Sequence, residues 1–366
     1  MTTSTRTSIL ADRHRALGSE LGDWNGMGVA WHYGSDPCDE HDAVRTAAGL
    51  FDVSGLKKVH VRGPDALDVV DHVITRNMRI VTPGNSVYGP NLTDEGTICD
   101  DAIIFNLGDG EWLLVHGSGK CMQRLQESAA GKNVDVEFDD DLHDISLQGP
   151  KAVGFLEAHT PLDLAGLKYF QQARTELFGH PVLISRTGYS GERGYEIFAR
   201  AAHVGDLWDQ ILGLGEDEGI VPCSFTCLDK VRVEAGLLFY PYDMTEVNSP
   251  WEVGLDWALS RTGGNYRGRD AAMALKGKDK IKVAGIGADH NGVLSGGDKL
   301  LYDGKEVGIV NSPAYSRRLK KSLALVHVAP ELAVAGTRLR VEGSVSCDAT
   351  VEATPFYDPK KTRTHG

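Results

Sequence analysis

Two adjacent carboxylates, Asp100 and Asp101, stand immediately before an apolar segment at 102–105. A carboxylate at the end of a rigid strand beside a pocket can serve as a general acid or base. Because side chains alternate between the two faces of a strand, at most one of the two faces any given cavity. An acidic turn that merely precedes a strand would give the same pattern, so the pair alone leaves both interpretations open.

A second dense stretch, at 185–196, places Tyr189 and Glu196 among three glycines. Glycines let a backbone approach a flat ligand closely, tyrosine can stack on the ligand, and a carboxylate can accept paired N–H groups from a heterocycle. These residue types favour a site for a planar heterocyclic molecule. A hairpin turn with a surface ion pair is the alternative interpretation.

Several common sites are missing from the sequence. No G-x-x-x-x-G-K-[ST] segment is present, and the glycine pairs at 213–215 and 285–287 lack the third glycine of a dinucleotide loop. G-x-S-x-G is absent too, which removes support for a serine hydrolase. Cys223 and Cys227 lie close together without a further His or Cys pair at zinc spacing, so we expect no metal.

Composition and charge narrow the class of protein further. The chain of 366 residues has 38 Lys and Arg against 51 Asp and Glu, a formal net charge of −13, which disfavours nucleic acid and anionic membrane as partners. Its length allows two or three domains. We expect a cytoplasmic protein, because the first residues lack the apolar core of a signal peptide and the six cysteines lack disulfide-framework spacing.

The elements that must position these residues follow a repeated pattern. Residues 57–62 alternate like a strand and lead through a Gly-Pro pair at 63–64 into an amphipathic helical stripe at 66–74. The same order of strand, Gly-Pro and helix returns at 145–156, with the second Gly-Pro 86 residues (149 − 63) after the first. This spacing predicts two related α+β units.

Beyond a glycine- and lysine-rich connection at 263–282, the sequence changes character. Short β-prone runs bounded by Gly, Asp or Pro favour a small β-barrel or sandwich; these runs lie at 283–286, 307–310, 322–326 and 338–341. The basic residues after Asp358 are expected to form a loose tail.

Six motifs occur in the order found in the glycine cleavage system T-protein (aminomethyltransferase) family, which the chain resembles over nearly its whole length. They are GLFDVS at 49–54, GTICDD at 96–101, LQGP at 147–150, RTGYSGERGYE at 186–196, RVEAG at 232–236 and PWEVG at 250–254. GKEVGIV at 304–310, followed by ALVHV at 324–328, resembles the family's small β-domain. The family includes tetrahydrofolate-dependent demethylases such as dimethylsulfoniopropionate demethylase.

The resemblance implies an α+β fold: a three-domain cloverleaf of two related ferredoxin-like α+β units and a C-terminal small β-barrel or jelly-roll domain around a central folate channel. The implied domains are a discontinuous folate-binding domain at 1–50 and 140–262, an inserted domain at 51–139 and the β-domain at 280–358. Residues 359–366 are the loose tail.

The resemblance also implies roles for individual residues. Asp100 matches the family's catalytic aspartate near the one-carbon atom of tetrahydrofolate, Tyr189 and Glu196 match residues that hold the pterin, and Tyr88 lies where the family lines the same channel. A carboxylate can pair with the amino and ring N–H groups of the pterin and so orient N5. Such a transferase needs alignment and one titratable group, and the family needs no metal.

One departure from the family pattern and one group of aromatic residues concern the one-carbon donor. T-proteins carry an arginine four residues before Arg232, and Leu228 stands there in this chain, which argues against aminomethyl transfer from a lipoyl carrier protein. Aromatic faces attract sulfonium or quaternary ammonium groups. The candidates for such a cage, which could equally fill cores, are Trp24, Trp31, Tyr33, Tyr240, Tyr242 and Trp251.

The leading hypothesis is therefore a tetrahydrofolate-dependent methyltransferase or demethylase that moves a methyl group from a small onium or methoxy donor to N5. The first alternative is a T-protein that makes 5,10-methylenetetrahydrofolate and releases ammonia. The second is a folate-binding assembly factor without transferase activity, although the Lys-Gly-Cys-Tyr-x-Gly-type segment of such relatives is absent. Tetrahydrofolate and a small methylated donor are the expected partners.

Overall fold

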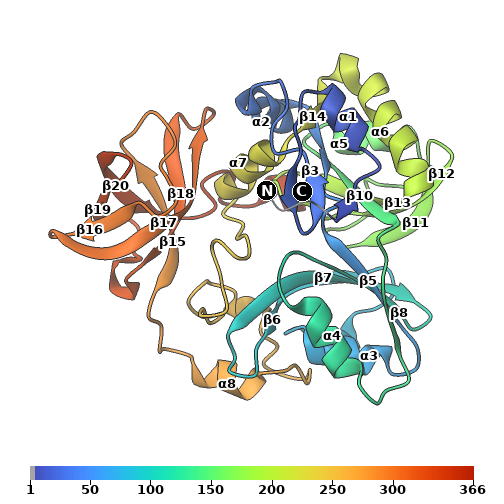
Figure 1. Ribbon diagram of the computed structural model, residues 1–366, viewed down its shortest axis with the longest axis horizontal. Helices are drawn as coiled ribbons and strands as arrows, with labels where there is room; N and C mark the ends of the chain where they lie inside the picture. Colours follow the sequence, from blue (N-terminus) through green and yellow to red (C-terminus); the bar gives the residue numbers. More distant parts are fainter. Residues whose placement is uncertain (1–4) are drawn as a thin grey trace.

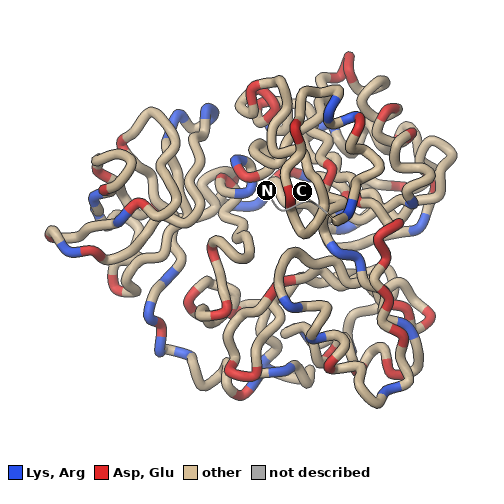
Figure 2. The backbone as a smooth tube through the Cα atoms, in the orientation of Figure 1, with Lys and Arg blue, Asp and Glu red and all other residues tan. Residues whose placement is uncertain are grey.

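The computed structural model describes residues 5–366, and residues 1–4, which the sequence assigned to the first domain, lie outside the described part. Two parts are each built on one sheet with helices, and a third part is a barrel set to one side (Figure 1). Basic and acidic residues are interspersed over all three parts (Figure 2). Within residues 5–366, no helix combines the length and apolar character that a bilayer crossing requires.

A six-stranded sheet forms the first part. It is antiparallel except for the parallel β4–β14 pair, and its strand order is β11 (Gln172–Leu177), β12 (His180–Ser185), β13 (Gly194–Arg200), β10 (Leu142–Gln148), β4 (Ala48–Asp52), β14 (Ile220–Cys223). One face packs on α5 (Ala152–Glu157) and α6 (Ala201–Gly215) through Ile145, Leu147 and Ile197. The other strand positions therefore point to the opposite face.

A five-stranded antiparallel sheet forms the second part. Its order is β6 (Ser86–Leu92), β7 (Ile98–Gly108), β8 (Glu111–His116), β5 (Lys57–Arg62), β9 (Asp135–Phe138). One face packs on α3 (Ala66–Val73) and α4 (Cys121–Ala129) through Val59, Ile104 and Leu114. All strands between β4 and β10 belong to this sheet, so the chain leaves the six-stranded sheet after Asp52 and returns at Leu142.

The repeated Gly-Pro turn has the same backbone geometry in both places. Gly63 has φ 125° and Gly149 has φ 143°, a region that side chains rarely adopt. A Cβ on Gly63 would lie 2.8 Å from the Asn133 carbonyl oxygen, and one on Gly149 would lie 2.5 Å from the Ala47 carbonyl oxygen. Each turn therefore requires glycine both for its conformation and for the close approach of a neighbouring backbone.

The two sheets face each other through their helix-free sides. Phe105 of β7 meets Phe198 of β13 edge to face, with ring centroids 5.4 Å apart. Leu113, Val115 and Leu142 complete this buried apolar contact. The residues that follow along the same faces of β6, β7 and β13 therefore lie near the junction between the two parts.

The barrel and the connecting segments complete the fold. The barrel closes in the order β15 (Lys282–Ala288), β18 (Lys321–Val328), β17 (Lys305–Ser316), β16 (Lys299–Tyr302), β19 (Arg338–Glu342), β20 (Ser346–Glu352). A small three-stranded sheet has the order β1 (Arg6–Thr7), β3 (Met27–Val29), β2 (Gly22–Trp24). The remaining helical segments are α1 (Ala11–Ala16), α2 (Pro37–Thr46), α7 (Phe225–Glu234), α8 (Arg269–Ala274), α9 (Thr362–His365), η1 (Met78–Ile80), η2 (Glu216–Glu218), η3 (Asp256–Ala258) and η4 (Pro330–Leu332).

The α+β fold class and the C-terminal barrel are confirmed. The end of the chain, predicted as a loose tail, contains α9 and lies against the β12–β13 loop. There Arg186 donates to the Gly366 carbonyl oxygen at 2.6 Å, and Thr364 donates to the Gly191 carbonyl oxygen at 3.0 Å.

Candidate functional site

Tyr88 and Asp101 share the helix-free face of the five-stranded sheet. Tyr88 is in register with Ile103, and alternation along β7 puts Asp101 on the same face as Ile103 and Phe105. The Tyr88 hydroxyl donates to Asp101 Oδ2 at 2.8 Å. This hydrogen bond fixes the phenol and the carboxylate together at the junction of the two sheets.

Asp100 points to the other face of the same strand. It is fully buried, and its Oδ2 accepts a hydrogen bond from the backbone N–H of Cys121 at 3.0 Å, at the start of α4. His116 Nδ1 lies 2.8 Å from the same oxygen. Asp100 thus holds the first turn of α4 and the end of β8, while the remaining His116 nitrogen, Nε2, is buried without a protein partner.

The charge of Asp101 affects the pKa values of two tyrosines, Tyr88 and Tyr189. Burial raises the pKa of Asp101 to about 7, the nearby charge of Asp100 adds to the rise, and the hydrogen bond from Tyr88 opposes it. Burial raises the pKa of Tyr88 well above its ordinary value, with Asp101 as the next cause. Burial also raises the pKa of Tyr189, and the charge of Asp101 contributes. Asp101, Tyr88 and Tyr189 therefore lie within one local electrostatic group.

Tyr189 and Glu196 belong to the six-stranded part. The Tyr189 hydroxyl donates a short hydrogen bond to the Leu238 carbonyl oxygen, in the segment after α7. Glu196 lies on the helix-free face of β13, in register with Ser146, and its Oε2 accepts a short hydrogen bond from the Thr187 hydroxyl. Burial raises the pKa of Glu196, so its proton is held more tightly than that of an ordinary glutamate. No hydrogen bond joins it to Tyr88 or Asp101 within the described residues.

Two of the glycines beside Tyr189 make room for a side chain of the protein itself. A Cβ on Gly188 would lie 2.2 Å from Gln148 Oε1, and one on Gly194 would lie 2.3 Å from the Gln148 amide carbon. Gln148 in turn donates to the Thr187 carbonyl oxygen at 3.2 Å. The buried Gln148 amide therefore shapes the loop that carries Tyr189.

The six aromatic residues proposed for a donor cage do not converge on one point. Tyr33 is buried with its hydroxyl 2.9 Å from His14 Nδ1, and Trp251 is buried with its indole N–H donating to the Ala272 carbonyl oxygen at 2.7 Å.

Three of the other four belong to one aromatic cluster. Trp24 and Trp31 pack on Phe225, with ring centroids 5.0 and 5.4 Å apart. Trp24 also stacks on Phe239, and the exposed Tyr242 stacks on the same Phe239 ring. Burial raises the pKa of the half-buried Tyr240 to about 12, with contributions from Glu246 and Asp100, which places it near the carboxylate pair.

Arg232 of α7 is buried and belongs to an ion pair inside the protein. Its guanidinium pairs with the buried Asp243 at 2.5 Å and donates to the Ser312 hydroxyl of β17 at 2.7 Å. It joins α7 to the barrel. Leu228, one turn earlier, is partly buried against the apolar cluster around Phe51 and offers no hydrogen-bond donor from its side chain.

The sequence did not single out His116, Thr187 or Tyr169. His116 follows the apolar run of β8 and could have been found only by knowing that β7 and β8 pair in register at Ala102. Thr187 sits nine residues before its partner Glu196. Burial raises the pKa of Tyr169 to about 12 and the charge of Glu196 adds to it, although no sequence motif includes this tyrosine.

Two groups of buried side chains have the composition of metal ligands: Glu40 with Cys223 and Cys227, and Asp100 with His116 and Cys121. Hydrogen bonds within the protein account for the carboxylates of both. Glu40 Oε2 accepts from the Ser224 hydroxyl at 2.7 Å, and Asp100 is held as described above. That the site needs no metal stays a prediction.

Comparison with known proteins gives the family. Residues 10–262 match the family model described as the GCVT N-terminal domain, and residues 282–358 match the glycine cleavage T-protein C-terminal barrel domain. The heme-dependent oxidative N-demethylase gamma subunit of Ectopseudomonas mendocina is 46% identical, over 99% of this chain and 99% of that protein. An aminomethyltransferase of Streptomyces coelicolor is 33% identical, over 98% of this chain and 99% of that protein.

A solved structure supports the same family assignment. The crystal structure of glycine cleavage system aminomethyltransferase T from Bartonella henselae has a TM-score of 0.90 to this chain at 25% identity, covering 97% of this chain and 99% of the other. The two family models together match most of the chain. The protein therefore belongs to the glycine cleavage T-protein (aminomethyltransferase) family.

Proposed function

We propose that this protein transfers a one-carbon unit to tetrahydrofolate. The observation that carries the proposal is the grouping of Asp101, Tyr88 and Tyr189 at the junction of the two sheets, with Glu196 on the facing sheet. Aromatic faces suit a flat pterin and a buried carboxylate suits its N–H groups. Family membership supports the same substrate.

The residues present fit a reduced pterin. Glu196 accepts from the amino and ring N–H groups, and the tyrosine rings of Tyr88 and Tyr189 line its faces. Tetrahydrofolate supplies the accepting nitrogen, N5. Asp101, whose pKa lies near neutrality, takes up the proton that the accepting nitrogen loses. The sequence predicted Asp100 as the catalytic carboxylate. In this proposal Asp100 has a different role, which is to position β7 and α4.

For the donor we propose a small N-methylated amine, in place of the sulfonium or methoxy compound of the leading sequence hypothesis. Two observations support this choice. The relative that is 46% identical over the full length is an N-demethylase gamma subunit, and two of the six cage candidates, Tyr33 and Trp251, are held by hydrogen bonds inside the protein. A partner oxidase subunit removes two electrons and one proton from the N–CH₃ group, which leaves an iminium ion. The accepting nitrogen N5 attacks its carbon and gives up its proton, which leaves with the departing amine. N10 then forms the second bond to the same carbon and releases its own proton, and the product is 5,10-methylenetetrahydrofolate.

Aminomethyl transfer from a lipoyl carrier protein is the second candidate, favoured by relatives named aminomethyltransferase at 33% identity. In that reaction the carbon arrives at the same oxidation level and ammonia departs. Leu228 counts against it, because T-proteins carry an arginine at the matching position.

The test combines binding with product analysis. Calorimetric titration of the purified protein with tetrahydrofolate is expected to show one site. Incubation with tetrahydrofolate, formaldehyde and dimethylamine, which form the iminium ion without an oxidase, is expected to give 5,10-methylenetetrahydrofolate faster than the uncatalysed condensation, and the Asp101→Asn variant is expected to lose that excess rate. Methyltetrahydrofolate formed from an onium or methoxy donor would restore the original hypothesis. Ammonia release from an aminomethyl-lipoyl carrier would favour the second candidate. Product formation no faster than the uncatalysed rate in every arm would leave only a binding protein.

A further inference from the structure

The tail segment, residues 357–366, follows the last barrel strand, β20, and ends against the six-stranded part (Figure 1). Asp358 fixes the turn that leads into α9. Its carboxylate accepts a hydrogen bond from the Thr362 hydroxyl at 2.8 Å and another from the Arg363 backbone N–H at 2.7 Å. The turn at Asp358 therefore determines where α9 and the Arg363 side chain lie.

The tail segment holds the β12–β13 loop on both sides of Tyr189. Before Tyr189, the Arg186 guanidinium donates to the Thr364 carbonyl oxygen at 3.2 Å and to the Gly366 carbonyl oxygen at 2.6 Å. After Tyr189, the Gly191 carbonyl oxygen accepts a hydrogen bond from the Thr364 hydroxyl at 3.0 Å. Tyr189 thus lies in the middle of a loop whose two arms are bound to the same segment.

An ion pair with a buried carboxylate adds to this attachment. The side chain of Glu192, in the same loop, is only 1% exposed, and its two oxygens each lie 3.2 Å from a guanidinium, one of Arg363 and one of Arg45 in α2. The Tyr357 ring lies beside both guanidinium groups, at 5.4 Å from Arg363 and 4.2 Å from Arg45. A buried carboxylate is costly when it loses a partner. The position of Glu192 therefore depends on two arginines, and one of them belongs to the tail segment.

The tail segment also contacts the surroundings of Glu196. The His365 ring lies 4.7 Å from the Tyr169 ring, centroid to centroid. Burial raises the pKa of Tyr169 and the charge of Glu196 adds to the rise, so this phenol lies near that carboxylate. Thr187, which donates to Glu196, belongs to the loop that the tail segment holds. Both residues proposed to bind the pterin, Tyr189 and Glu196, therefore have neighbours in contact with this segment.

We propose that the tail segment is a clamp that positions the β12–β13 loop for pterin binding, and that Arg363 is a positioning residue which acts through Glu192. The inference rests on the proposed function. It adds that the loop binds tetrahydrofolate tightly only in the arrangement that the tail segment imposes. Because coupling between two binding events is reciprocal, bound tetrahydrofolate must in turn hold the tail segment more firmly.

Calorimetric titration of the full-length protein with tetrahydrofolate measures the first effect. Arg363→Gln is expected to raise the dissociation constant about fivefold to tenfold, the magnitude of one charge-assisted contact with a buried partner. Arg363→Lys keeps the positive charge and is expected to recover most of the lost affinity. At saturating tetrahydrofolate, turnover of both variants is expected to equal that of the wild type, because Arg363 contacts no reacting group.

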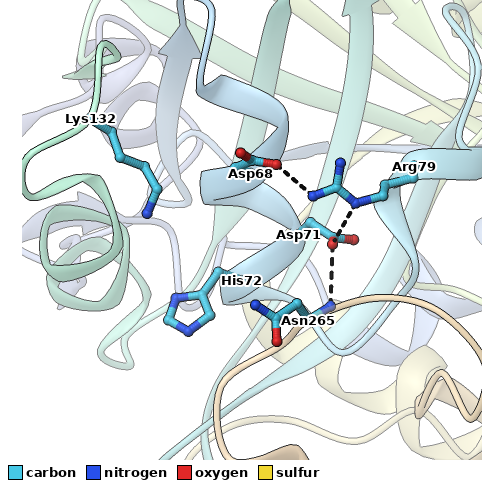
Figure 3. Close-up of a pocket in the computed structure, with 6 residues that line it drawn as sticks. All are labelled: Asp68, Asp71, His72, Arg79, Lys132 and Asn265. Carbon is cyan, nitrogen blue, oxygen red and sulfur yellow. Dashed lines mark hydrogen bonds and ion pairs between the residues drawn. The ribbon is translucent and has the colours of Figure 1, made fainter.

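Arg79 provides the matched control in the five-stranded part. It is also a half-exposed arginine paired with carboxylates, and it donates to Asp68 at 2.5 Å and pairs with Asp71 at 3.3 Å in a surface cavity of about 280 Å³ (Figure 3). Arg79→Gln removes the same charge without a change in the β12–β13 loop. Its affinity for tetrahydrofolate is expected to equal that of the wild type.

Limited trypsin digestion of the wild type measures the reciprocal effect. The tail segment contains three residues after which trypsin cleaves, Lys360, Lys361 and Arg363. Cleavage requires local opening of the segment, and its rate follows the population of the open form. Mass analysis of the intact chain is expected to show slower cleavage at these positions when tetrahydrofolate is saturating. This measurement does not depend on the folding of any variant.

The outcomes separate this inference from the proposed function. Wild-type protein that does not bind tetrahydrofolate overturns both. If the wild type binds it, then either equal affinity in Arg363→Gln or tail cleavage that tetrahydrofolate leaves unchanged overturns the clamp alone. An equal loss of affinity in Arg79→Gln would show that the removal of any such charge weakens binding, and this would also overturn the clamp.

Discussion

Asp100 and Asp101 are consecutive in β7, yet their carboxylates lie on opposite faces of the sheet. Asp101 accepts from Tyr88 on the face that meets the six-stranded sheet, while Asp100 accepts from the Cys121 N–H and lies beside His116 on the face that packs on α4. The two carboxylates are close enough for the charge of Asp100 to raise the pKa of Asp101. One acid therefore contacts the candidate site and the other sets the electrostatics and position of the first.

We predict that Asp101→Asn lowers turnover by two or more orders of magnitude, the usual contribution of a general acid or base being about 10²- to 10⁴-fold. Tetrahydrofolate affinity should change little, because Glu196 and the tyrosine rings are untouched. Steady-state kinetics and calorimetry measure the two effects. The control is Asp109→Asn on the exposed β7–β8 turn; wild-type turnover in Asp101→Asn would remove this residue from the mechanism.

Asp100→Asn should also lower turnover, by a different route. An asparagine at position 100 has no negative charge, so the pKa of Asp101 should fall toward the ordinary aspartate value, and the contacts with the α4 N-terminus and His116 should weaken. The acid limb of the pH–rate profile is then expected to move to lower pH, a shift that Asp101→Asn cannot show. A profile without that shift, with activity lost at every pH, would support the original sequence assignment of Asp100 as the catalytic group.

The Tyr88→Phe variant tests the sign of the same pKa shift. The hydrogen bond from Tyr88 favours the ionised form of Asp101, so its removal should raise the pKa of Asp101 above about 7. Since Asp101 acts in its ionised form, wild-type turnover should fall as the pH drops through about 7, and in Tyr88→Phe the fall should begin at a higher pH. A profile that stays in place would mean that another group controls the acid limb.

Glu196 provides a binding prediction with its own pH dependence. Burial raises its pKa, and only the ionised form accepts two N–H bonds from the pterin. Tetrahydrofolate affinity should therefore increase as the pH rises through neutrality, and Glu196→Gln should weaken binding at least tenfold and remove the pH dependence. Glu176→Gln, on the exposed edge strand β11 of the same sheet, is the control. Equal affinity in Glu196→Gln and wild type would exclude Glu196 from the pterin site.

Local sequence rules were sufficient to predict those elements whose backbone conformation requires particular residue types. The two turns could be recognised from their Gly-Pro pairs, which are typical of the residues just before a helix. In the structure both glycines have positive φ values, and the turns precede α3 and α5. The barrel strands could be recognised by their length and their turn residues. The alternation rule also predicted correctly that Asp100 and Asp101 would face opposite ways.

The sequence does not specify which face of each strand contacts which neighbouring element. The choice between Asp100 and Asp101 depends on the pairing of β7 with β6 and β8, and His116 becomes relevant only because β8 ends beside Asp100. The role of Gly188 likewise depends on Gln148, forty residues earlier in the chain. These contacts between distant segments follow from strand order, which a single sequence does not specify.

The buried ion cluster around Glu234 sets a final prediction, on stability. Burial opposes ionisation of Glu234, but His41, Arg45 and Ser316 outweigh it and lower the pKa to about 2. Arg45 lies 2.8 Å away and is itself buried, so the pair joins α2, α7 and, through Ser316, the barrel.

A carboxyl whose folded pKa is about 2, against an ordinary 4.5, contributes about 3 kcal/mol above pH 4.5. That contribution is lost as the pH falls from about 4.5 to about 2. Glu234→Gln should therefore lower the unfolding free energy at pH 7 by about 3 kcal/mol, since it leaves the buried Arg45 with only the more distant carboxylate of Glu192, at 3.2 Å. The substitution should also flatten the pH dependence of stability in the acid range. Denaturant titrations at pH 7 and pH 4 measure both effects, and an unfolding free energy in Glu234→Gln equal to that of wild type at pH 7 would show that the cluster does not hold the three elements together.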